Sequence, residues 1–186
     1  MNKFPSSIAL FSTVLVSSII TVSTAAAIEF PDGRVAFEKS PLLIGAHTTF
    51  NNVRVRQAKY YFDLELPPDV GESLQKVVIN QRQGAERIKF RLDKTTAYFG
   101  NHKDRKEELS LQVSQDEATK AITIIFDRPI SPGSQLTVRL RPRRNPNFGG
   151  VYLFGVTAFP TGEKPSGLYL GAGRLQFYQS GDRFFW

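Results

Sequence analysis

Residues 60–68 read YYFDLELPP, a stretch in which large apolar side chains alternate with other residues until two prolines follow. In an extended chain Phe62 and Leu64 point to one side, whereas Asp63 and Glu65 point to the other. A period of two predicts a β-strand with one buried face and one wet face. The prolines end the strand because they have no N–H to donate to a neighbouring strand.

The same alternation recurs at short intervals along the chain. Pro, Gly, Asn and Asp separate the runs and favour turns, and no segment after residue 28 shows the pattern of a long helix. Strands at this spacing are typical of antiparallel sandwiches and barrels. We therefore predict an all-β fold, an antiparallel β-sandwich of the immunoglobulin-like type. The further runs are 88–92, 109–113, 122–126 and 136–140.

The last third of the chain has a different pattern. Residues 151–159 read VYLFGVTAF and are apolar on both faces. This predicts a central strand covered on both sides, or a strand whose outer face meets a partner. The run 168–178 follows, and its glycines, Gly171 and Gly173, indicate a bulge or a close approach of two backbones.

The N-terminal residues 1–27 have the features of a secretory signal peptide. Lys3 supplies a positive charge, an apolar run extends over 8–22, and Ala25 and Ala27 occupy the positions that a signal peptidase recognises. The apolar run is shorter than the roughly 20 residues that a membrane-spanning helix needs. We predict a signal-peptide helix, cleaved after Ala27, and a product that does not span the membrane.

The remaining residues, 28–186, are expected to form a single β-sandwich domain that is exported to the periplasm or the extracellular space. The sequence has no cysteine, which excludes disulfides, thiol catalysis and cysteine-ligated metals. A domain of this length buries about two-thirds of its unfolded surface and therefore needs no disulfide bonds to be stable. We expect no cofactor.

The net charge of +7 bears on the kind of partner. For an exported protein, a basic surface suits anionic envelope polymers or lipid headgroups better than nucleic acid. The expected partners are thus an envelope polysaccharide or an envelope protein, and not nucleic acid. The alternative is that the charge serves solubility alone. The sequence leaves the oligomeric state open.

The basic residues fall into stripes with a spacing of two. One stripe covers 139–143, a second 87–91 and a third 54–56. Two stripes on one sheet would make a basic surface; alternatively, they pair across strands with Asp63 and Glu65 and the charges cancel. Exposed tyrosines could stack on sugar rings beside the arginines. The candidate ligand-contact residues are Arg139, Arg141, Arg143, Tyr152 and Tyr169.

No catalytic motif stands out, and we predict a protein that is not an enzyme. Ser73 and Lys76 match S-x-x-K, but the scaffold and the Ser-Asp-Asn element that accompany this motif are missing. His47 and His102 lie far apart in the sequence, without neighbours at metal-ligand spacing, so no metal site is expected. A cell-wall hydrolase that uses Asp63 and Glu65 is the less favoured alternative.

Several segments, in this order and spacing, resemble a family of secreted cyanobacterial proteins whose domain has no known function. The resemblance implies export and supplies no catalytic residues. The segments are IEFPDG (28–33), YYFDLELP (60–67), GESLQK (71–76), RPISPGS (128–134), NP (145–146) and GVYLFGV (150–156).

Together these observations predict an exported, non-catalytic domain that binds or scaffolds an envelope component. An anionic envelope polysaccharide is the favoured ligand. The alternative is a protein–protein interaction module whose 151–159 strand pairs with a partner.

Overall fold

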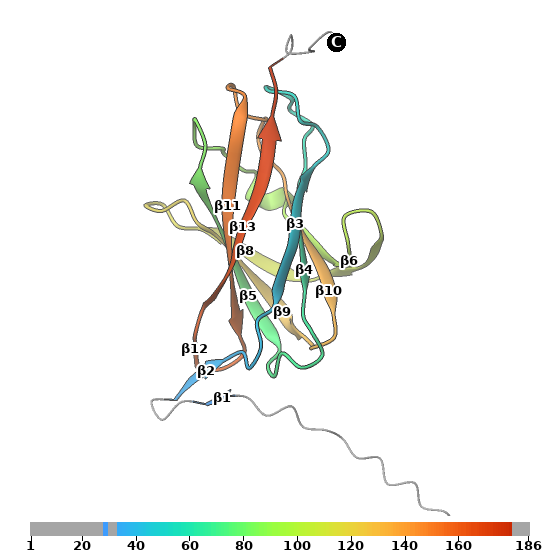
Figure 1. The fold of residues 1–186 in the computed structure, drawn as a ribbon, viewed down its shortest axis with the longest axis vertical. Helices are drawn as coiled ribbons and strands as arrows, with labels where there is room; N and C mark the ends of the chain where they lie inside the picture. The colour runs from blue at the N-terminus through green and yellow to red at the C-terminus, as the bar shows by residue number, and fades with distance from the viewer. Residues whose placement is uncertain (1–27, 30–32, 180–186) are drawn as a thin grey trace, which may run out of the picture.

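The structure is a computed structural model that describes residues 28–29 and 33–179. The predicted signal peptide, 1–27, lies outside the described residues. Two five-stranded sheets pack face to face with antiparallel strand pairing within each sheet (Figure 1), so the predicted all-β antiparallel sandwich is confirmed. Within the described residues no helix is long and apolar enough to cross a membrane.

The first sheet has the strand order β3-β4-β10-β6-β7. Alternate residues of β4 and β10, such as Phe62 and Val138, are fully buried between the sheets. Asp63 and Thr137 face each other across the same two strands on the outer side. The strands are β3 (Leu42–Thr48), β4 (Tyr60–Glu65), β10 (Gln135–Leu140), β6 (Thr96–Gly100) and β7 (Arg105–Leu109).

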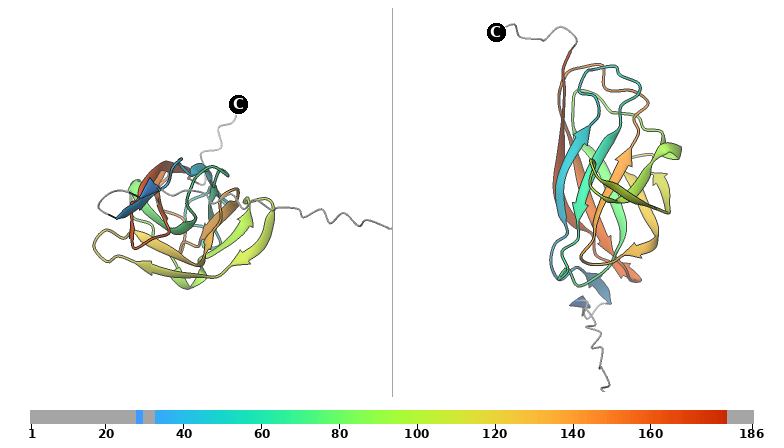
Figure 2. Two further views of the ribbon diagram at one scale, coloured as in Figure 1. Left: turned by 90° about the horizontal axis from the view of Figure 1, so that it is seen from below. Right: turned by 90° about the vertical axis from the view of Figure 1, so that its right-hand side faces the viewer.

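The second sheet has the order β13-β11-β5-β9-β8. A small third sheet of three short strands and a 3-10 helix complete the described elements, and Figure 2 shows the sandwich from two further sides. The strands of the second sheet are β13 (Leu168–Phe177), β11 (Gly150–Pro160), β5 (Leu74–Gln83), β9 (Ile122–Ile130) and β8 (Leu111–Gln115). The short elements are β1 (Ile28–Glu29), β2 (Arg34–Ala36), β12 (Lys164–Pro165) and η1 (Leu92–Lys94).

Strand β11 is a central strand, as its sequence predicts. It pairs with β13 along one edge and with β5 along the other. The alternative in which this strand pairs with a partner protein is therefore wrong, because both hydrogen-bonding edges are occupied.

The glycines of β13 allow the close approach that the sequence indicates. A Cβ atom on Gly173 would lie 2.6 Å from the Cβ of Ala46 on β3 and 3.2 Å from the Phe62 ring. Here β13 packs against β3, at the side of the sandwich where these two edge strands of the sheets meet (Figure 1). The predicted bulge is present as well. The pairing of β13 with β11 shifts register between Val156, which pairs with Gly171, and Thr157, which pairs with Tyr169.

Two expected strands differ from the structure. Residues 88–92 make only one bridge among the described residues, between Phe90 and Pro142, with one backbone hydrogen bond on each side of it. The run 109–113 is divided between the sheets, since β7 ends at Leu109 in the first and β8 begins at Leu111 in the second.

Candidate functional site

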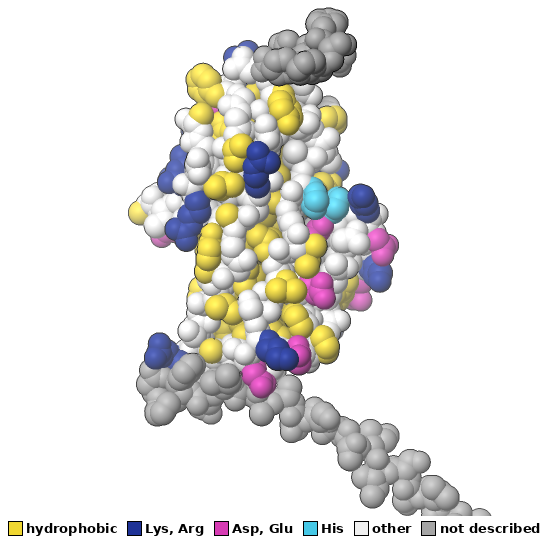
Figure 3. All heavy atoms as spheres, viewed as in Figure 1, with side chains coloured by type: hydrophobic (Ala, Val, Ile, Leu, Met, Phe, Trp, Pro, Cys, Tyr) yellow, Lys and Arg dark blue, Asp and Glu magenta, His cyan; other side chains and the backbone are white. Residues whose placement is uncertain are grey.

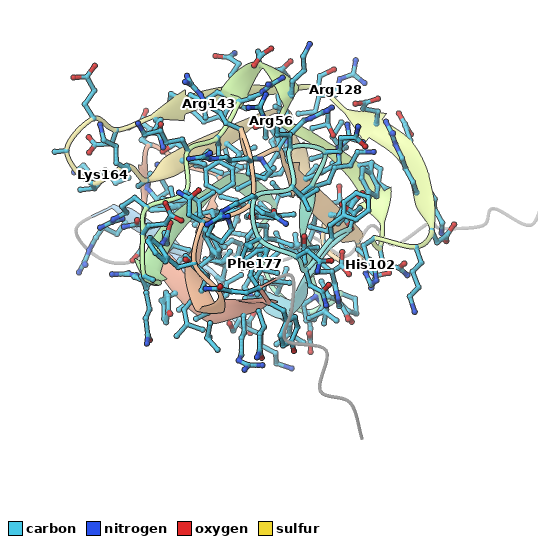
Figure 4. All side chains as sticks on the ribbon, turned by 90° about the horizontal axis from the view of Figure 1, so that it is seen from above. Arg56, His102, Arg128, Arg143, Lys164 and Phe177 are labelled. Atoms are coloured by element: carbon cyan, nitrogen blue, oxygen red, sulfur yellow. The ribbon has the colours of Figure 1, made fainter. Side chains whose placement is uncertain are left out.

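A basic hollow of about 480 Å³ lies between three loop segments of the sandwich. Arg56 and Arg143, which come from two of these segments, lie close together in Figure 4. Neutral residues and a single acid, Glu86, complete the lining. The basic side chains that line it are Arg56, Arg87, Lys89, Arg91, Arg143 and Arg144.

Backbone pairing around Phe90 places these cations. The Arg91 N–H donates to the carbonyl of Arg141 at 2.8 Å, and the Arg143 N–H donates to the carbonyl of Lys89 at 2.8 Å. Phe90 and Ile88 are buried, so the residues that alternate with them, Arg87, Lys89 and Arg91, point outward. The stripe at 87–91 and the last residue of the stripe at 139–143, Arg143, therefore meet here. In the described structure Asp63 and Glu65 form no ion pair with a residue of either stripe, so the alternative in which the charges cancel by such pairing is wrong.

Asn145 fixes the loops beneath the hollow. Its backbone N–H donates to the carbonyl of Val55 at 2.7 Å, and its side-chain nitrogen lies 2.8 Å from the carbonyls of Phe50 and Asn52. Its side-chain oxygen accepts a hydrogen bond of 2.9 Å from the Tyr60 hydroxyl. Asn145 is fully buried, and its bond with Tyr60 forms away from water. These bonds hold the loop that carries Arg56 against the loop that carries Arg143 and Arg144.

The hollow is strongly positive. All six basic side chains are exposed, and none of them forms an ion pair with any residue in the described part of the chain. Glu86 forms no ion pair with them in the described structure, and its carboxylate accepts hydrogen bonds from the backbone and side-chain nitrogens of Asn147. The arrangement suits an anionic ligand, and most of its cations are arginines that bind carboxylate or sulfate through two parallel bonds.

Of the five predicted ligand-contact residues, only Arg143 lines the hollow. Arg139 lies on the outer face of the first sheet, between Tyr61 and Thr96. Arg141 is half-buried next to the hollow. Tyr169 is 51% exposed on the second sheet, where the Arg82 guanidinium lies 5.7 Å from its ring centre.

The expectation that Tyr152 is exposed is wrong. Its ring is fully buried, stands edge-on to Phe177 with centroids 5.4 Å apart, and its hydroxyl donates to the carbonyl of Phe148 at 3.0 Å. The physical reason is the position of Tyr152 on β11, where it points inward like Phe154. It therefore serves the core and not a ligand.

A second polar cluster lies on the outer face of the first sheet and escapes sequence reasoning. His47, Asp63 and His102 come from β3, β4 and the turn after β6, and Asp63 is only 2% exposed. The two imidazole rings stack with centroids 3.7 Å apart. Burial and the neighbouring charge of His102 lower the pKa of His47. In Figure 3 the histidines lie at the surface beside a basic side chain, with acidic side chains nearby.

The chain was compared with protein families. The family model described as "Protein of unknown function (DUF2808)" matches residues 34–177. The chain belongs to this family. The DUF2808 match spans both sheets of the sandwich, and it confirms the resemblance to a family without known function; the cyanobacterial setting stays a prediction. No curated protein matches the chain at a significant level.

Solved structures similar to this DUF2808 domain include surface proteins of bacteria. The collagen-binding domain from a Staphylococcus aureus adhesin has a TM-score of 0.40 at 6% identity, over 75% of this chain and 99% of that one. BslA, a bacterial hydrophobin, has a TM-score of 0.46 at 12% identity, over 76% and 95%. The collagen-binding subdomain ACE19 of an Enterococcus faecalis surface protein has 0.43 at 11%, over 75% and 98%. These values carry no information about the ligand of this chain.

Proposed function

We propose that this DUF2808 domain is an exported, non-catalytic binding module for an acidic envelope polysaccharide, which it takes up in the basic hollow. The single observation that carries the proposal is the convergence of six unpaired cations on one hollow of about 480 Å³ within the described structure. Cations that served solubility alone would be scattered and paired with acids across strands. Export follows from the predicted signal peptide.

The chemistry of the hollow favours carboxylate or sulfate groups. Five of its six cations are arginines, whose planar guanidinium matches the two oxygens of such a group better than a lysine ammonium does. Exposed arginines keep most of their hydration, so each contact is weak and the binding relies on several charges along a polymer. A small single anion is consequently expected to bind poorly.

The hydrolase alternative gains no support from the geometry. Asp63, one of the two acids on which it depends together with Glu65, is buried, and both of its oxygens face groups of the protein itself. A general acid must reach the oxygen of the bond that it cleaves. Asp63 is out of reach of a polymer on the surface.

Retention on immobilised polygalacturonate and dextran sulfate, with neutral dextran as the control, tests the proposal. We expect retention on both acidic polymers, none on dextran, and elution by salt well before 1 M, where the Debye length falls to about 3 Å. Equal retention on neutral dextran would refute recognition by charge. Absence of retention on both acidic polymers at low salt would refute the function itself. A duplex DNA column, run in parallel, shows whether sugar acids are preferred over phosphates.

A further inference from the structure

We propose that His47, Asp63 and His102 form a binding site for a divalent transition metal ion of the zinc type, separate from the basic hollow. Each residue offers one ligand atom, and these three atoms lie within 4.8 Å of one another. Two imidazoles and one carboxylate are a ligand set that suits zinc, copper and nickel ions. The site is independent of the proposed polysaccharide function.

The distances suit coordination after a small movement. The Nε2 atom of His47 lies 3.5 Å from Oδ2 of Asp63, and Nδ1 of His102 lies 2.5 Å from the same oxygen. Two ligands of a tetrahedral zinc ion, each about 2.1 Å from it, are about 3.4 Å apart. His47 thus stands at the required separation from Asp63, and the ring of His102 has to withdraw by about 1 Å.

The two oxygens of Asp63 are divided between two tasks. Oδ1 accepts hydrogen bonds from the backbone N–H of His102 at 3.1 Å and from the Thr137 hydroxyl at 2.7 Å. Oδ2 faces only the two imidazoles among the described residues. A carboxylate whose second oxygen is fixed by hydrogen bonds is typical of metal ligands, because those bonds orient the free oxygen. Asp63 is built in this way.

A bulge in β3 turns His47 toward Asp63. Leu43 pairs with Leu64 and Gly45 pairs with Asp63, so Ile44 is an extra residue in the ladder. Without it, every later side chain of β3 would change face, and His47 would point into the core. Gly45 is also needed, because a Cβ atom at this position would lie 3.2 Å from Nε2 of His47.

A tight turn brings His102 to the same place. Gly100 has a φ of +95°, and a Cβ atom on it would lie 2.1 Å from the carbonyl oxygen of Asp104. The side chain of Asn101 accepts hydrogen bonds from the backbone N–H groups of Lys103 and Asp104 at 2.9 and 3.0 Å. These features fold the chain back on itself, so that His102 packs over β4.

The site is open on one side. The side chains of His47 and His102 are 43% and 23% exposed, whereas Asp63 is buried beneath them. Three protein ligands with access to solvent leave at least one position of the metal for water or for a ligand group. Lys103 directly follows His102 in the chain, and its positive charge opposes that of a bound cation. Removal of this charge should therefore tighten binding.

The whole protein, purified without a histidine tag, allows a direct test, because His47 and His102 are its only histidines. Titration with ZnCl₂ in a calorimeter should show one ion per chain. His47→Gln and His102→Gln should each weaken binding at least tenfold, while Lys103→Gln should tighten it. Since Asp63→Asn removes a buried charge and could unfold the chain, far-ultraviolet circular dichroism of each variant checks the fold.

Nitrogen NMR of the two imidazoles identifies the ligand atoms. Zinc should shift Nε2 of His47 and Nδ1 of His102, and it should leave the other two ring nitrogens protonated. If the folded protein does not bind one zinc ion per chain, the proposed site is refuted. Binding that both histidine variants retain, or zinc shifts at the opposite nitrogens, would overturn it equally. If the unaltered protein bound zinc but was not retained on polygalacturonate, the proposed polysaccharide function alone would be refuted and the metal site would stand.

Discussion

The hydroxyl of Tyr60 donates a hydrogen bond of 2.9 Å to the side-chain oxygen of Asn145, and both residues are fully buried. Tyr60 belongs to the first sheet, and Asn145 belongs to the loop that carries Arg143 and Arg144 into the basic hollow. This bond therefore joins the rigid part of the sandwich to the surface that we propose binds the polymer.

Replacement of Asn145 should destabilise the protein strongly. Asn145→Ala removes the partners of the Tyr60 hydroxyl and of the carbonyls of Phe50 and Asn52. We expect a loss of about 3 kcal/mol in the free energy of unfolding, because buried groups are left without hydrogen bonds. Tyr60→Phe, the matched control, should cost only about 1 kcal/mol. Urea denaturation measures both, and equal losses would contradict the role given to Asn145.

Alkaline pH should destabilise the fold through Tyr60. Burial, and then the neighbouring Tyr152, raise the pKa of Tyr60 above its usual value of 10. The folded state therefore keeps a proton that the unfolded chain releases above pH 10, and stability present below pH 10 is lost as the pH rises. Urea denaturation between pH 9 and pH 11 should show a smaller decline in the free energy of unfolding for Tyr60→Phe than for the unaltered protein. An unchanged decline would assign the effect to other groups.

The close packing of β13 on β3 should depend on Gly173. Gly173→Ala places a Cβ atom 2.6 Å from that of Ala46, and we expect a loss of about 1–3 kcal/mol from overpacking. In the Ala46→Gly background the clash partner is absent, so the same substitution should cost much less. A double-mutant cycle by urea denaturation gives the coupling. Additive effects would show that the two strands do not meet here.

Gly100 should be needed for the metal site and not for the polymer site. Gly100→Ala combines a left-handed backbone with a clash against the Asp104 carbonyl, so the turn that carries His102 has to change. We expect zinc binding to weaken at least tenfold, while polygalacturonate retention stays unchanged. Gly133→Ala, which also has a positive φ but only contacts near 4 Å, is the control. If retention fell together with zinc binding, the two sites would not be independent.

The sequence predicts most strands because alternation is visible in them. The run at 60–66 shows the buried face of β4 directly, and prolines mark its end. Strand β11 is apolar on both faces, so its sequence shows a central strand without revealing which residues point inward. For this reason Tyr152 is expected at the surface, although it lies in the core.

The sites depend on features that alternation does not reveal. The bulge at Ile44 changes the face of His47, and nothing in the local sequence marks the extra residue. Likewise, the stripes at 87–91 and 139–143 are visible separately, but their meeting depends on the bridge between Phe90 and Pro142. Asp63 is the one local signal, because it is a charged residue in the middle of a buried strand.

Charge reversal in the basic hollow tests the central claim most directly. Arg56→Glu and Arg143→Glu each lower the net charge of the hollow by two units. Arg128→Glu lowers the net charge of the protein by the same amount, but at an exposed arginine outside the lining of the hollow. The measured quantity is the salt concentration that elutes each protein from immobilised polygalacturonate. We predict that both hollow variants elute at much lower salt than the unaltered protein, and that Arg128→Glu elutes close to it. Equal shifts in all three variants would contradict the account, because net charge alone would then explain the binding.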